Sequence, residues 1–153
     1  MQPTLFLRSA AIVSLLLGTG HMLGKPWTPT FDPGAAAVVA TMKSQRVHVE
    51  GFDRSFMDFY LGFGWMVGVY LLAQAVVLWM LVGLAAGEPA RLRRLAGVFF
   101  IANLVQTIVA AQYLFTLPLV MSGIVAFCLG AAVIMPTATY AHATVESDHA
   151  PQV

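Results

Sequence analysis

Four stretches of the chain are almost continuously apolar and long enough to cross a membrane as helices. They cover about residues 5–23, 59–84, 95–115 and 119–140. A transmembrane helix needs roughly 20 predominantly apolar residues, and the second stretch contains no charged residue. The pattern therefore predicts an all-α fold, an integral membrane four-helix bundle built from residues 1–141.

The first apolar stretch also has features of a signal peptide, because Arg8 precedes a short apolar run. A signal peptide is cleaved at a site of the form small-x-small, and Gly18-Thr19-Gly20 is a poor example of such a site. We therefore expect the first helix to be retained.

The connections between the later stretches predict how the chain is oriented in the membrane. Proline follows a helix-stopping glycine at 87–89 and follows a threonine at 116–118, which favours short turns between antiparallel helices. Arginines crowd the first of these turns, at 91, 93 and 94, and short cytoplasmic loops are rich in arginine. Both termini are thus expected in the cytoplasm, with residues 142–153 forming a flexible cytoplasmic tail.

The long segment 25–58 is expected on the outer side of the membrane, with structure of its own. Asp32-Pro33-Gly34 resembles a helix start, and the apolar positions after it recur at helical spacing through Met42. This predicts a short interfacial helix lying on the membrane face. Apolar and polar residues then alternate from Val47 to Phe52, and Gly51 favours a turn of the chain.

Composition excludes several functions. The chain is 59% hydrophobic and 10% charged, with a net charge of +1, so it lacks the basic footprint of a nucleic-acid-binding protein. Its single cysteine, Cys128, excludes an internal disulfide, a CxxC redox pair and a cysteine-rich zinc site.

Polar side chains within the apolar stretches are the first group of candidate site residues. Polar groups in a membrane tend to face the interior of a helix bundle, and Gln74 and Gln106 are expected at similar depth. One interpretation is an interhelical amide hydrogen bond; the other is a wet or ligand-filled cavity. The cavity-lining candidates are Tyr60, Gln74, Asn103, Gln106 and Tyr113.

Ionisable residues before the second long helix form the second group. We expect His21, near the outer end of the first helix, to reach the level of Asp58, so that acid and imidazole meet at an outer mouth. Such a group suits acid/base chemistry, although an interfacial salt-bridge network is the alternative interpretation. The candidates are His21, His48, Glu50, Asp53 and Asp58.

A metal site is the least favoured interpretation of this second group. His48 and Glu50 offer two ligands, but Asp53 or His21 would have to complete the set. Haem held by two transmembrane histidines is disfavoured because only His21 lies at membrane depth. We therefore expect neither a metal nor a cofactor.

Pairs of small residues four apart predict where helices approach closely. These pairs are Gly20 with Gly24, Gly64 with Gly68, and Ala126 with Gly130. Small residues at this spacing let helix backbones pack tightly in membranes.

In size and plan the chain resembles small bacterial four-helix membrane proteins, loosely the DoxX-like group and related families without assigned function. The most distinctive segment is Gly51-Phe52-Asp53-Arg54-Ser55-Phe56-Met57-Asp58-Phe59-Tyr60-Leu61-Gly62-Phe63-Gly64. The plan is also similar to that of four-helix sterol-isomerase-like proteins, but this chain lacks acids deep in its helices. The resemblance implies a location in a bacterial inner (plasma) membrane, but it assigns no functional residue.

Two functional hypotheses follow. The first is a binding or accessory protein that holds a lipophilic ligand or a membrane complex, with membrane lipid, a lipophilic small molecule, another membrane protein or a second copy of the chain as partner. The second is a small membrane enzyme that uses acid/base chemistry on a lipid, sterol-like or quinone substrate. The neutral amides deep in the helices favour the first.

Overall fold

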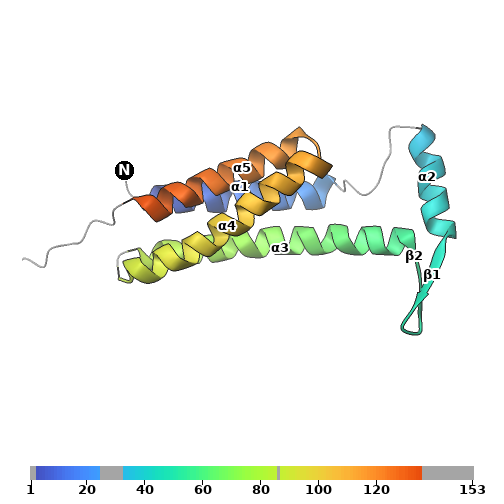
Figure 1. Cartoon of the computed structure of the whole chain (residues 1–153), viewed down its shortest axis with the longest axis horizontal. Helices are drawn as coiled ribbons and strands as arrows, with labels where there is room; N and C mark the ends of the chain where they lie inside the picture. The colour runs from blue at the N-terminus through green and yellow to red at the C-terminus, as the bar shows by residue number, and fades with distance from the viewer. Residues whose placement is uncertain (1–2, 25–32, 86, 136–153) are drawn as a thin grey trace, which may run out of the picture.

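The computed structural model describes residues 3–24, 33–85 and 87–135, most of which are helical (Figure 1). Four helices are long and apolar enough to cross a membrane, which indicates a multi-pass membrane protein. They are α1 (Pro3–Gly24), α3 (Phe56–Leu84), α4 (Pro89–Tyr113) and α5 (Thr116–Ile134).

Several helix boundaries differ from the predicted ones. Helix α3 begins at Phe56, three residues before the predicted start, because Ser55 caps it and Asp58 closes a capping box. Helix α4 begins at Pro89 rather than at residue 95, since proline suits the first helical turn. Helix α5 ends at Ile134, and the rest of the predicted span, 136–140, lies outside the described residues.

The segment between α1 and α3 contains a helix and a β-hairpin. Helix α2 covers Pro33–Ser44, and the antiparallel strands β1 (Arg46–Val49) and β2 (Phe52–Ser55) follow it. Glu50 and Gly51 form the turn, both with positive φ, 52° and 84°. Two positive φ angles are typical of the tightest hairpin turns. The expected cap Asp32 lies outside the described residues, as does the predicted tail at 142–153.

Helix α1 lies between α3 and α5, and α4 packs mainly on α5. The buried apolar cluster joins all four long helices and includes Leu7, Leu78, Leu92 and Leu129, each fully buried. Helices α3 and α4 are consecutive in the chain, but α3 packs more closely on α1, and α4 on α5, than α3 and α4 pack on each other. The core therefore centres on the α1–α5 pair.

Close helix approach occurs at glycines that the spacing only partly predicted. A Cβ atom on Gly18 would lie 3.1 Å from the Leu71 Cβ, and one on Gly68 would collide with Met22. Among the described residues, nothing lies within 4 Å of the position of a Cβ atom on Gly20 or Gly24, so the prediction that this pair lies in a contact between the long helices is wrong. The face of α1 that meets α3 carries Gly18 instead.

Helix α3 is the longest element and extends past the ends of the other long helices at its N-terminal end (Figure 1). Helix α2 runs across the direction of the long helices beside this end, and the hairpin continues beyond it. Because 29 residues of α-helix measure about 43 Å, α3 exceeds the roughly 30 Å hydrocarbon thickness of a membrane. Helix α3 is thus longer than a span of the hydrocarbon region requires.

Candidate functional site

A polar group lies between three helices at the middle of their packing. The amides of Gln74 and Asn103 exchange two hydrogen bonds, Gln74 Nε2 to Asn103 Oδ1 at 3.2 Å and Asn103 Nδ2 to Gln74 Oε1 at 3.1 Å. Gln74 Nε2 also donates to Ser14 Oγ of α1 at 2.9 Å. Asn103 is 2% exposed and Ser14 is fully buried. These bonds connect α1, α3 and α4 inside a low-dielectric interior.

A second polar contact joins α4 to α5. Thr107 Oγ1 lies 3.2 Å from Ser122 Oγ. Ser122 donates its single proton to the Pro118 carbonyl at 2.7 Å, and Thr107 shares its proton between the Ser122 hydroxyl and the Asn103 carbonyl, which lies at 2.7 Å. Every buried side-chain nitrogen or oxygen in the described part of the chain has a hydrogen-bond partner. The interior polar residues therefore satisfy one another and hold the helices together.

These contacts correct the expected pairing of the two glutamines. Gln74 meets Asn103, one turn before Gln106, because α3 and α4 approach at that level. Gln106 is half-buried. Of the remaining cavity-lining candidates, Tyr60 is 45% exposed on α3 and Tyr113 is 77% exposed at the end of α4.

His21 and Asp58 do not meet as the sequence led us to expect. His21 Nε2 lies 2.9 Å from the carbonyl oxygen of Gly64, six residues further along α3 than Asp58. Six residues correspond to about 9 Å along a helix. The Asp58 carboxylate instead accepts a hydrogen bond from the Ser55 amide at 2.8 Å, while the Ser55 hydroxyl accepts one from the Asp58 amide at 3.1 Å.

The other predicted acid/base residues lie on the hairpin. Arg46 Nε and Asp53 Oδ2 form an ion pair at 2.6 Å, with both side chains about half exposed. His48 lies opposite Asp53 in the strand register, and Glu50 lies in the turn. Within residues 3–24, 33–85 and 87–135, no three His, Cys, Asp or Glu residues are grouped as metal ligands would be. An exposed ion pair of this kind contributes about 0–1 kcal/mol, so it orders the hairpin only weakly.

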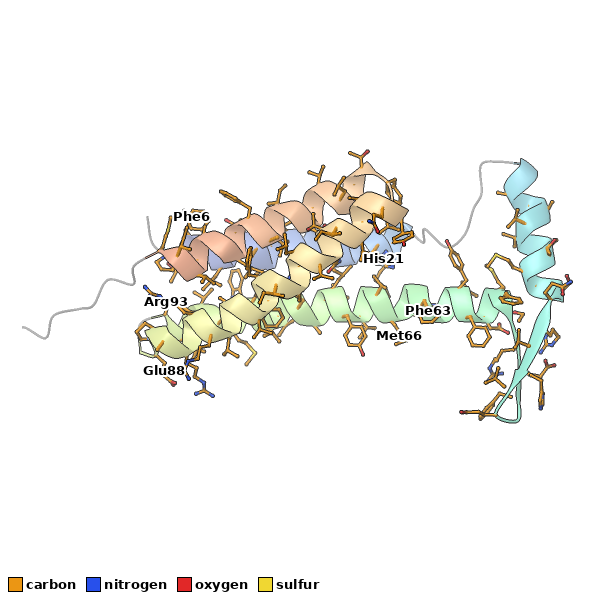
Figure 2. All side chains as sticks on the ribbon, viewed as in Figure 1. Phe6, His21, Phe63, Met66, Glu88 and Arg93 are labelled. Atoms are coloured by element: carbon orange, nitrogen blue, oxygen red, sulfur yellow. The ribbon has the colours of Figure 1, made fainter. Side chains whose placement is uncertain are left out.

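A hollow lies along the first three turns of α3, and its outer part extends past the other long helices. It measures about 210 Å³ and opens to the surroundings. Figure 2 labels two of its residues, Phe63 and Met66. Most of the residues that line it lie on one face of the first three turns of α3, and Arg54 comes from strand β2. The full lining consists of Arg54, Asp58, Phe59, Gly62, Phe63 and Met66.

Charge and apolar surface are separated within this hollow. The Arg54 guanidinium lies over the Phe52 ring, 5.5 Å from its centroid, where the cation is attracted to the aromatic face. Phe59, Phe63 and Met66 follow along the helix and are at least 40% exposed. The hollow thus has a charged outer end and an apolar inner end.

The sequence singled out Asp58 but not the helix face that it shares with Phe59, Phe63 and Met66. Positions 58, 62 and 66, and positions 59 and 63, are four residues apart and so project from one side of a helix. That spacing is the signal that would have identified the hollow. Arg54 could not be assigned to it without knowing how the hairpin joins α3.

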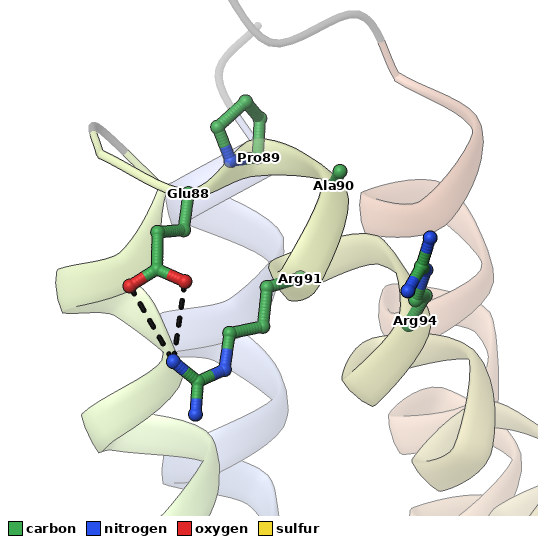
Figure 3. Close-up of a pocket in the computed structure, with 5 residues that line it drawn as sticks. All are labelled: Glu88, Pro89, Ala90, Arg91 and Arg94. Atoms are coloured by element: carbon green, nitrogen blue, oxygen red, sulfur yellow. Dashed lines mark hydrogen bonds and ion pairs between the residues drawn. The ribbon is translucent and has the colours of Figure 1, made fainter.

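A second hollow lies at the other end of the molecule, at the start of α4 (Figure 3). It is lined by Glu88, Pro89, Ala90, Arg91 and Arg94, and measures about 510 Å³. Arg91 pairs with Glu88 at 3.2 Å, and the Arg94 side chain lies apart from this pair in Figure 3. Arg93 donates to the carbonyl of Met135, beyond the end of α5, at 3.1 Å. Arg91 and Arg93 therefore contact the turn before α4 and the end of α5.

Comparison of the chain with protein-family models, curated proteins and solved structures finds no match.

Proposed function

We propose that the chain is an integral membrane binding protein of a bacterial inner membrane, and that it holds a lipophilic ligand in the hollow at the outer end of α3. The observation that carries this proposal is the joining of a charged rim, Arg54 and Asp58, to an apolar floor on one helix face. Ligand sites are typically apolar recesses with a few well-placed polar groups. The hollow has this composition.

The orientation we propose places this hollow on the outer side of the membrane. Arginines 91, 93 and 94 favour a cytoplasmic turn before α4, and both termini then lie in the cytoplasm. Under this arrangement the four long helices form a transmembrane bundle. Helix α2 and the hairpin lie at the outer headgroups, and Phe59, Phe63 and Met66 lie at the boundary with the acyl chains.

Binding is better supported than acid/base catalysis. The enzyme hypothesis placed His21 beside Asp58, but His21 contacts the Gly64 carbonyl while Asp58 contacts Ser55. The Asp53 carboxylate, which lies opposite His48 in the strand register, is paired with Arg46. The deep amides Gln74 and Asn103 are committed to each other. A general base must reach the proton that it removes. His21 and Asp58 are not placed to exchange a proton with each other.

We also propose that the chain is related to the DoxX-like group. The segment Gly51–Gly64 that carries the resemblance includes five of the hollow's six lining residues, all except Met66. A segment that builds a binding surface would be expected to distinguish a family.

The test fills the hollow and measures what remains bound. Met66→Trp places a large side chain in the hollow, and Met80→Trp is the matched control because Met80 is also exposed on α3. Each protein is purified in mild detergent and its organic extract is analysed by mass spectrometry. We expect a co-purified lipophilic species with the wild type and Met80→Trp and its loss with Met66→Trp. Equal amounts in all three proteins would contradict the proposal.

A further inference from the structure

Arg54 and Asp58 line the same hollow with opposite charges but do not pair with each other. In the described part of the chain, ion pairs join Arg46 to Asp53 and Arg91 to Glu88. The two charges of the hollow are therefore more than 4 Å apart at the nearest nitrogen and oxygen. Each can bind a separate group of one ligand.

Each charge has free capacity in a fixed position. The Arg54 guanidinium is held over the Phe52 ring, and its planar set of five N–H donors matches a phosphate group. Asp58 uses Oδ2 to accept from the Ser55 amide, which leaves Oδ1 for a second donor. Its place in the first turn of α3 favours a negative charge there.

The remaining lining residues provide apolar surface that runs away from these charges. Phe59 and Phe63 lie one turn apart on α3, and Met66 lies a turn further toward the middle of the helix. Gly62 lies between them without a side chain, and a Cβ there would have no neighbour within 4 Å. A ligand that fits this order of groups has a phosphate and a cation at one end and hydrocarbon at the other.

We infer that the hollow binds a phospholipid whose headgroup carries a primary ammonium, that is, phosphatidylethanolamine from the outer leaflet. Its phosphate contacts Arg54, its ammonium donates to Asp58, and an acyl chain lies along Phe59, Phe63 and Met66. This inference rests on the proposed function and specifies the ligand. The charge complementarity of the hollow selects it over other lipids.

Headgroup chemistry sets the selectivity. The trimethylammonium group of phosphatidylcholine carries a positive charge but has no N–H to donate to Asp58. The headgroup of phosphatidylglycerol has no cation, so Asp58 would face an uncompensated phosphate. A partly exposed ion pair corresponds to a preference of about fivefold, and we expect phosphatidylethanolamine to be retained over both other lipids by this factor.

The experiment uses the full chain in detergent micelles that contain phosphatidylethanolamine, phosphatidylcholine and phosphatidylglycerol in equal amounts. Native mass spectrometry then counts the lipids that remain bound. Arg54→Gln should lower retention of all three about tenfold, while Lys43→Gln, which removes a cation outside the hollow, should not. Asp58→Asn keeps an acceptor for the Ser55 amide and should abolish the headgroup preference, whereas Asp53→Asn should preserve it.

The outcomes separate this inference from the proposed function. Equal retention of the three lipids by the wild type, or a preference for phosphatidylglycerol, would overturn the headgroup assignment while Met66→Trp still releases lipid. If Met66→Trp releases none, the hollow holds no ligand and the proposed function fails as well. The preference of the wild type requires no variant to fold, so it decides the headgroup assignment even if Arg54→Gln is unstable.

Discussion

Gln74 on α3 and Asn103 on α4 exchange a reciprocal pair of amide hydrogen bonds between two helices that otherwise touch little. In a membrane, water cannot replace a lost partner, so an amide whose partner is removed must find another protein group or remain unsatisfied. This pair, with Ser14, therefore fixes the position of α3 relative to α4.

Removing one amide of the pair should lower the free energy of unfolding by more than half as much as removing both amides. We expect Gln74→Leu and Asn103→Leu each to destabilise the protein by about 1–2 kcal/mol, with the double variant less destabilised than the sum. Thermal or denaturant unfolding in detergent measures the three values. Strict additivity would show that the two amides are not coupled.

The contact between α1 and α3 should be sensitive to side-chain size at one glycine and insensitive at another. A leucine at Gly18 must displace Leu71 and Leu72, whose atoms lie 3.1 Å from the position of a Cβ atom. Gly18→Leu should cost about 1–3 kcal/mol. Gly20→Leu, two residues along in open space, is the control, and a similar loss of stability from both variants would refute the packing.

Much of the fold follows from the sequence because apolar stretches must satisfy their own backbone in a membrane, and a helix does so within one segment. The sequence also indicated the alternation through Val49 and the turn at Gly51, but not the second strand, Phe52–Ser55, that pairs with the first. The side-chain partners did not follow. Helical depth placed Gln74 level with Gln106, but the direction in which α4 crosses α3 selects Asn103, and that direction depends on packing of all the helices.

The sequence likewise identified a residue of the candidate site but not its contacts. Asp58 was identified, but as a partner of His21, because the expected helix began after it rather than two residues before it. Once Ser55 caps α3 at Phe56, Asp58 becomes part of the helix start and His21 lies about two turns away. The predicted contact between His21 and Asp58 was therefore wrong because the local cap that starts α3 was not recognised in the sequence.

The capping box should be measurable on its own. Ser55→Ala removes the oxygen that accepts from the Asp58 amide and should destabilise the start of α3 by about 1 kcal/mol. Hydrogen exchange of amides 56–59 should accelerate correspondingly. Ser44→Ala serves as the control, since Ser44 bonds to Thr41 at the end of α2; unchanged exchange in Ser55→Ala would show that the box contributes nothing.

Orientation is tested by thiol labelling in intact cells. Cys128, the single native cysteine, is first replaced by alanine, and a cysteine is then introduced at Lys43 or at Arg93. A membrane-impermeant maleimide should label position 43 and not position 93, because the arginine-rich turn resists translocation. Labelling only at 93 would invert the topology.

The central claim, that a lipid occupies the hollow rather than merely surrounding the helix, is tested most directly by photocrosslinking. A photoreactive p-benzoylphenylalanine replaces Phe63 in the hollow or Trp79 further along α3, at positions that are 65% and 56% exposed. The protein is extracted into detergent, washed free of bulk lipid and irradiated, and its intact mass is measured. We expect a phospholipid adduct at position 63 and none at position 79, whereas equal adducts at both positions, or none at either, would contradict the account.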